Sequence, residues 1–226
     1  MNYPGKELEL FDKANIWRKY VYLLVKRSIE DKILEVGAGI GSFTNNYKNK
    51  FSDITLTELD PHNITRLKQK FRDTKIKISS HYTSQIEEKF NTILYMNVLE
   101  HIEDDKEEVN IAVSKLNQGG HLIILVPAHN ELYSKFDKEI GHFRRYKVDF
   151  FNQLNIDNVE IIKLQYIDCS GYFLYYLNKF FFKNEVYPSL LKIFIWDKIF
   201  TPLTIILDKL LNYRYGKNVL CVMKRK

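Results

Sequence analysis

The chain has 226 residues, of which 45% are hydrophobic and 27% are charged, and this composition fits one α/β domain with a substantial core. Its net charge of +6 permits anionic partners such as phosphates, anionic lipid or RNA without selecting among them. Two distant cysteines, Cys169 and Cys221, argue against a disulfide-rich scaffold and favour a reducing compartment. Residues 2–7 are polar and lack the apolar region of a signal peptide, so we expect a cytoplasmic protein.

A glycine cluster organises the first half of the chain. Before it, residues 8–28 carry apolar side chains at helical spacing and predict one or two helices. Apolar residues 32–36 then lead into Gly37, Gly39 and Gly41, which predicts a buried strand, a tight turn and a helix near 42–49. Glycines let the backbone approach a ligand closely, and free N–H groups at the start of a helix favour an electron-rich ligand group.

A second strand, predicted over residues 53–58, ends in an acidic residue. Glu58 follows the glycines by about 20 residues, the position from which a carboxylate accepts both hydroxyls of a ribose. A helix should begin at Pro61, with Asp60 as its cap. Together, the glycine turn and the acid predict an adenosine-type cofactor.

Strands and helices continue to alternate up to residue 127. We expect strands over 75–79, 91–96 and 121–126, and a charged helix over 104–116 that Gly119 and Gly120 terminate. Such alternation predicts a parallel, doubly wound sheet whose ligands bind at the carboxyl ends of the strands.

The pattern changes after residue 128. A helix is predicted over 148–154, with strands over 159–166 and 219–223. The segment between these strands, residues 170–213, is rich in aromatic and apolar residues, but charges and two prolines interrupt it before it reaches the length of a membrane span. Three interpretations stay open: core helices or a dimer face, a surface for an apolar or lipid-linked substrate, and peripheral membrane contact.

Four segments in order resemble the motifs of class I S-adenosylmethionine-dependent methyltransferases: LEVGAGIG (34–41), TELDP (57–61), NVLEHIEDD (97–105) and GGHLIILVPA (119–128). A fifth, IGHFRRY (140–146), resembles the LGHYRRY segment of a subgroup often found beside glycosyltransferases. This resemblance implies a Rossmann-like, doubly wound, mostly parallel seven-stranded sheet with an antiparallel last strand, N-terminal helices and an aromatic-rich helical insert. We expect one domain, 1–226, comprising a helical cap (1–30), a cofactor-binding core (31–127) and a substrate-side region (128–226).

The resemblance also implies that S-adenosylmethionine is the cofactor. Glu35 and Gly37 would hold its methionyl part, and Glu58 its ribose. No carboxylate follows the third strand, so a backbone contact together with stacking of Tyr82 would hold the adenine instead. The full set of expected cofactor-binding residues is Glu35, Gly37, Ala38, Gly39, Glu58, Leu59, Tyr82 and Asn97.

Candidate catalytic residues follow the fourth and fifth strands. His101 is a candidate base or substrate contact, and His142, Arg144 and Tyr146 are expected to form a lid over the cofactor, ahead of Arg145. Arginines beside an imidazole suit a carboxylate or phosphate group. The alternative for this segment is a solvated basic loop that forms salt bridges with nearby acids. His129 is a second candidate base.

We expect no metal ion. In ubiquinone-pathway O-methyltransferases, a stretch similar to Glu100-His101 binds a divalent metal with the help of an acid three residues before the glutamate. Asn97 occupies that position here, which removes a hard oxygen ligand.

These residues predict an S-adenosylmethionine-dependent methyltransferase that methylates an oxygen of a small, lipid-linked or glycan-linked anionic acceptor. We expect no nucleic-acid partner, and we leave a homodimer and peripheral membrane contact open. The alternatives are an RNA or protein methyltransferase, a protein that binds S-adenosylmethionine without catalysis, and a dehydrogenase.

Overall fold

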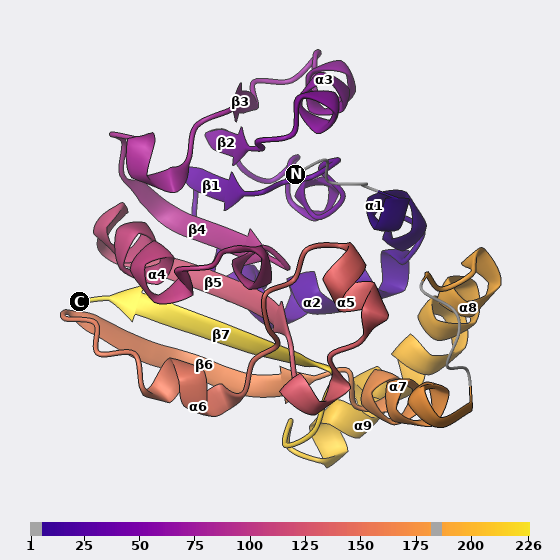
Figure 1. Ribbon diagram of the computed structural model, residues 1–226. Helices are drawn as coiled ribbons and strands as arrows, with labels where there is room; N and C mark the ends of the chain where they lie inside the picture. The colour runs from indigo at the N-terminus through magenta and orange to yellow at the C-terminus, as the bar shows by residue number, and fades with distance from the viewer. Residues whose placement is uncertain (1–5, 182–186) are drawn as a thin grey trace.

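The computed structural model describes residues 6–181 and 187–226. The strands form one sheet of order β3-β2-β1-β4-β5-β7-β6, in which β7 runs antiparallel to both of its neighbours and the other pairs are parallel (Figure 1). This is the seven-stranded, mostly parallel sheet expected from the sequence. Its strands are β1 (Ile33–Val36), β2 (Ile54–Thr57), β3 (Lys77–Ser79), β4 (Phe90–Met96), β5 (Leu116–Pro127), β6 (Val159–Ile167) and β7 (Asn218–Arg225).

Helices cover both faces of the sheet, and those of the insert gather beyond the carboxyl ends of the parallel strands (Figure 1). The α-helices are α1 (Lys6–Phe11), α2 (Asn15–Val25), α3 (Pro61–Lys70), α4 (Asp105–Ser114), α5 (Lys135–Glu139), α6 (Val148–Asn152), α7 (Cys169–Phe181), α8 (Leu190–Ile195) and α9 (Thr201–Leu210). Residues 182–186 of the predicted insert and residues 1–5 of the predicted cap lie outside the described residues.

Two apolar clusters bury the two faces of the sheet. Successive residues of a strand point to opposite faces, so Ile33 packs in one cluster with α2 while Leu34 packs in the other with α4. Both side chains are fully buried. Burial on both faces explains why the central strands read as continuous apolar runs.

Two expectations about local structure were wrong. Residues 42–49 form turns and a short 3-10 helix (Thr44–Asn46) rather than an α-helix. Here Thr44 and Tyr47 turn inward to Glu35, which fixes the chain in a tighter path. The two glycines at 119 and 120 lie inside β5 and do not terminate a helix, because α4 already ends at Ser114.

The cap of α3 is confirmed, since Asp60 Oδ1 accepts a hydrogen bond from the backbone N–H of Asn63 at 2.9 Å.

Buried aspartates join the insert to the N-terminal helix α2. Asp197 accepts the backbone N–H of Trp17 at 2.9 Å, and Asp208 accepts the hydroxyl of Tyr20 at 2.7 Å. Asp208 also accepts the backbone N–H of Cys169 at 2.9 Å, so it holds the start of α7 as well. These contacts fix the insert and the N-terminal helix to each other above one face of the sheet.

The insert exposes many large apolar side chains, with Lys198 and Lys209 exposed among them. Seven of these apolar side chains belong to its last part: Leu190, Leu191, Phe194, Ile199, Leu203, Ile206 and Leu210. None of the helices that the structure describes combines the length and the apolar character needed to cross a bilayer. The three interpretations of this segment therefore stay predictions.

Candidate functional site

The glycine turn after β1 adopts a backbone conformation that other residues rarely accept. Gly37, Gly39 and Gly41 have φ values of +61°, +57° and +69°. A Cβ on Gly37 would lie 2.7 Å from Val98, and one on Gly41 would lie 2.6 Å from Phe71. The glycines therefore let the turn pack tightly against its neighbours at the carboxyl end of β1.

Glu58 holds this turn from the end of β2. Its Oε2 accepts the backbone N–H of Gly39 at 2.7 Å, and its Oε1 accepts those of Leu59 and Asp60 at 2.9 and 3.0 Å. An ionised carboxylate can accept about four hydrogen bonds, so Oε2 retains capacity for a further donor such as a ribose hydroxyl.

Glu35 supports the turn from below. Its side chain is buried and accepts hydrogen bonds from the hydroxyls of Thr44, at 2.7 Å, and Tyr47. Burial raises the pKa of Glu35 to about 7, against the opposing effect of these two hydroxyls.

A cavity of about 1710 Å³ opens at the carboxyl ends of β1, β2, β4 and β5. The glycine turn and Glu58 line one part of it. Aromatic side chains of the cap, α5 and the insert line another: Phe11, Trp17, Phe136, Tyr175, Tyr187 and Trp196. The volume exceeds that of a typical pocket for one small molecule, so it has room for a cofactor and an acceptor together.

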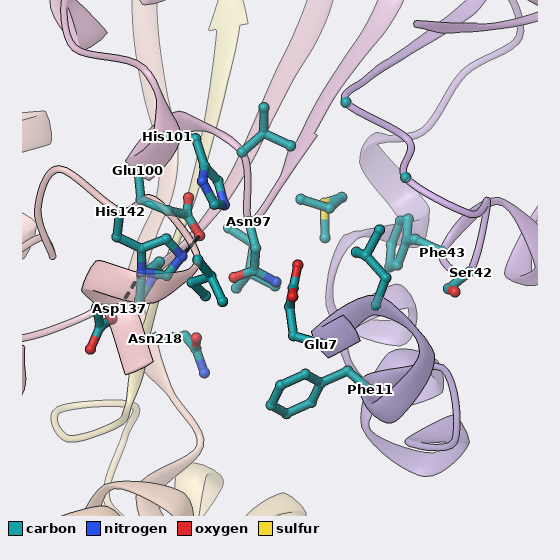
Figure 2. A pocket seen from close by; sticks show the side chains of 18 of the residues that line it. Glu7, Phe11, Ser42, Phe43, Asn97, Glu100, His101, Asp137, His142 and Asn218 are labelled. Atoms are coloured by element: carbon teal, nitrogen blue, oxygen red, sulfur yellow. Dashed lines mark hydrogen bonds and ion pairs between the residues drawn. The ribbon is translucent and has the colours of Figure 1, made fainter. Parts of the chain in front are cut away.

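Across the cavity from Ser42 and Phe43 lies a polar cluster of Glu100, His101 and His142, which we call the polar wall (Figure 2). Glu100 is fully buried, and neither of its carboxylate oxygens has a hydrogen-bond partner among the described residues. The Nε2 atom of His142 lies 3.7 Å from Glu100 Oε1, and the ring of His101 lies 4.6 Å from that of His142, edge to face.

Burial governs the protonation of the polar wall. It raises the pKa of Glu100 to about 7, although the nearby His142 opposes the shift. Burial and the neighbouring His142 lower the pKa of His101 to about 4, so this imidazole is neutral at physiological pH.

A family model described as a methyltransferase domain matches residues 10–158. The chain belongs to this methyltransferase family. It is an S-adenosylmethionine-dependent methyltransferase, and S-adenosylmethionine is its cofactor. No curated protein matches the chain.

Solved structures share the fold of this methyltransferase at low sequence identity. A methyltransferase from Clostridium acetobutylicum is 16% identical in sequence, with a TM-score of 0.61. The match covers 97% of this chain and 98% of the Clostridium chain. The N-methyltransferase NodS from Bradyrhizobium japonicum, solved with S-adenosyl-l-homocysteine, is 14% identical with a TM-score of 0.56. The match covers 100% of this chain and 89% of the NodS chain. Coclaurine N-methyltransferase, bound to N-methylheliamine and S-adenosyl-l-homocysteine, is 13% identical with a TM-score of 0.63. The match covers 93% of this chain and 72% of the coclaurine N-methyltransferase chain.

The residues of the methyltransferase fit its cofactor. Gly37 and Gly39 of the glycine turn line the cavity, and Glu58 offers a carboxylate beside them. Every residue expected to bind the cofactor lines the cavity: Glu35, Gly37, Ala38, Gly39, Glu58, Leu59, Tyr82 and Asn97. Tyr82 is 61% exposed, so its ring is accessible to a planar ligand group. Their individual roles stay predictions.

The structure separates the expected catalytic residues into two groups. His101 and His142 line the cavity, whereas Arg144 and Tyr146 do not. Arg144 Nη1 donates to Asp105 Oδ2 at 2.8 Å, and the hydroxyl of Tyr146 donates to the same oxygen at 2.9 Å. These two side chains anchor their segment to α4, and we do not include them in the proposed site.

Arg145 lines the cavity instead, although the sequence analysis ranked it behind its neighbour. Its Nε and Nη2 atoms donate to the two oxygens of Asp137 at 2.8 and 3.0 Å in a buried, two-pronged pair. Burial alone would raise the pKa of Asp137. The hydrogen bond from His142 and the charge of Arg145 outweigh burial and hold this pKa well below its ordinary value. The pair thus fixes the segment that carries His142.

Sequence reasoning did not select two acidic residues of the cavity. Glu100 could have been found from its position directly before His101, at the end of the fourth strand. Glu7 had no comparable signal, because it lies in a polar N-terminal stretch. In the structure it is buried and lines the cavity, and neither of its carboxylate oxygens has a hydrogen-bond partner among the described residues.

Proposed function

We propose that this methyltransferase methylates a small-molecule acceptor whose attacking oxygen or nitrogen carries a proton and approaches the polar wall. One observation carries the proposal: the glycine turn faces the same cavity as Glu100, whose carboxylate oxygens have no hydrogen-bond partner among the residues that the structure describes. When bound, S-adenosylmethionine supplies an activated methyl group, so alignment of the acceptor provides most of the rate enhancement.

Glu100 is the group that would take the proton of the acceptor. A general base works best when its pKa lies near the working pH, and the pKa of Glu100 is about 7. His101 and His142 border it, so they would orient the acceptor beside the carboxylate.

The charged side chains near the polar wall favour a different class of acceptor from the anionic one expected from the sequence. Both arginines of the segment 140–146 pair with carboxylates, Arg144 with Asp105 and Arg145 with Asp137, and neither is available for an anionic acceptor. Glu7 and Glu100 instead place two carboxylates on the cavity wall that have no hydrogen-bond partner within the described part of the chain. These features favour a hydroxyl or an amine over the anionic oxygen acceptor predicted from the sequence. Glycan-linked or lipid-linked hydroxyls are compatible with this proposal.

The test is a transfer assay with methyl-labelled S-adenosylmethionine and a panel of small alcohols, amines and carboxylates. We expect the labelled methyl group to be transferred to alcohols or amines of the panel. In Glu100→Gln we expect turnover to fall about 100-fold or more, the usual contribution of a general base, with unchanged affinity for S-adenosylhomocysteine. Glu88→Gln is the matched control, because Glu88 is exposed and lies outside the cavity. Label confined to carboxylates, or normal turnover in Glu100→Gln, would contradict the proposal.

A further inference from the structure

We propose that Glu100, His101 and His142 together bind one divalent transition-metal ion at the polar wall. Each residue offers one ligand atom, and these three atoms all lie within 4.8 Å of one another. The binding of the ion is inferred from this geometry, whereas its role rests on the proposed function. With the ion bound, Glu100 is a ligand, and the ion would take over the activation of the acceptor that the proposed function assigns to Glu100.

The environment of Glu100 points to a missing cation. Buried carboxylates are normally paired or hydrogen-bonded, because leaving a charge without a partner in a protein interior is costly. Glu100 is fully buried, and neither of its carboxylate oxygens has a hydrogen-bond partner among the described residues. His142 Nε2, 3.7 Å from Oε1, lies within ion-pair range but beyond a hydrogen bond. The nearby guanidinium of Arg145 cannot serve, since it is already engaged in the two-pronged pair with Asp137.

His142 is held in the form that a metal ion requires. Its Nδ1 atom lies 2.9 Å from Asp137 Oδ1, and a carboxylate can only accept, so the ring proton is on Nδ1. In the neutral ring, the lone pair of Nε2 then points toward Glu100 (Figure 2). A histidine whose second nitrogen donates to a carboxylate is the usual arrangement around protein-bound metals.

The distance between His142 Nε2 and Glu100 Oε1 supports an ion between them. At 3.7 Å it is too long for a hydrogen bond. Two ligand atoms that share a tetrahedral zinc ion are separated by about 3.4 Å, because each lies about 2.1 Å from the metal. A small movement of either side chain would bring this pair of ligand atoms to that separation.

The ligand set selects the class of ion. Two imidazoles and one carboxylate suit Zn²⁺, Co²⁺ or Fe²⁺, whereas Mg²⁺ and Ca²⁺ prefer ligand sets made of oxygen. The expectation of no metal considered only residues 97–101, and the structure supplies His142 from a different segment. Three protein ligands leave a coordination position for the acceptor, and an ion there would lower the pKa of an acceptor hydroxyl.

The experiment titrates untagged, chelator-treated protein with Zn²⁺ and Co²⁺ by calorimetry, and with Mg²⁺ for comparison. We expect one Zn²⁺ or Co²⁺ per chain, no binding of Mg²⁺ at the same concentrations, and visible absorption from bound Co²⁺. Glu100→Gln and His142→Ala should each weaken Zn²⁺ binding by about 100-fold or more, the upper range seen even for the loss of outer-shell partners. His62→Ala, an exposed histidine on α3, should bind like the wild type.

Affinity for S-adenosylhomocysteine shows whether each variant is folded, because the glycine turn and Glu58, which are expected to bind it, do not belong to the polar wall. Failure of the wild type to bind Zn²⁺ and Co²⁺, or equally tight binding by folded Glu100→Gln and His142→Ala, would overturn the metal site. Methyl transfer by metal-free protein that is lost in Glu100→Gln would overturn the role of the ion and leave the proposed function standing.

Discussion

Replacing Glu35 with glutamine should change how the stability of the protein depends on pH. The carboxyl of Glu35 is buried below the glycine turn, and its pKa is about 7 against an ordinary value of 4.5. Because the folded state holds this proton more tightly than the unfolded state, Glu35 stabilises the fold most at low pH. Its contribution is lost as the pH rises from about 4.5 to about 7. The shift corresponds to about 3 kcal/mol of unfolding free energy.

Glutamine cannot ionise, but its carbonyl can still accept hydrogen bonds from Thr44 and Tyr47. We therefore expect Glu35→Gln to gain stability relative to the wild type as the pH rises, by up to about 3 kcal/mol between pH 5 and pH 8. Urea denaturation at several pH values measures the difference. The control Glu88→Gln should differ from the wild type by a constant amount. Parallel curves for Glu35→Gln and the wild type would refute the reasoning.

Three further changes test other parts of the site. Glu58→Gln should weaken S-adenosylhomocysteine binding about 10-fold to 100-fold, because charge-assisted hydrogen bonds worth about 1.5–3 kcal/mol are lost; unchanged affinity in calorimetry would contradict this. Asp137→Asn should lower the unfolding free energy by about 3–5 kcal/mol, since it leaves Arg145 buried without its counter-charge; a loss below about 1 kcal/mol in urea denaturation would argue against this role. Arg144→Ala should leave cofactor affinity and methyl transfer unchanged while slightly lowering the melting temperature, because its guanidinium faces Asp105 outside the cavity; reduced turnover would return Arg144 to the site.

The positions of the strands along the chain and the glycine turn could be predicted, because each depends on the local sequence pattern. Apolar runs that end in glycines or prolines mark buried strands, and the expected positions of β1, β2 and β4 agree with the structure. The cap at Asp60 was predictable for the same reason, since a cap needs only its own backbone neighbours. The helix expected over 42–49 failed where a distant residue intervened, because Glu35 draws Thr44 and Tyr47 inward.

Roles in the cavity were harder to predict because they depend on which way a side chain points. Arg144 and Arg145 are neighbours in sequence, yet one faces α4 and the other lines the cavity. Nothing in their chemistry distinguishes them. The importance of Glu100 is likewise invisible until packing shows that its carboxylate has no hydrogen-bond partner within the described part of the chain.

The aspartates that hold α2 link opposite ends of the polypeptide. Trp17 and its partner Asp197 are 180 positions apart, and Tyr20 and Asp208 are 188 apart. During synthesis from the N-terminus, α2 must wait until residue 208 has left the ribosome before all of these contacts form. Contacts of such long sequence separation are costly to close, so they form late and slow folding. In the nascent chain, the glycine turn should therefore form well before α2 and the insert pack against each other. A truncated chain that lacks the insert should expose an apolar surface to which chaperones bind.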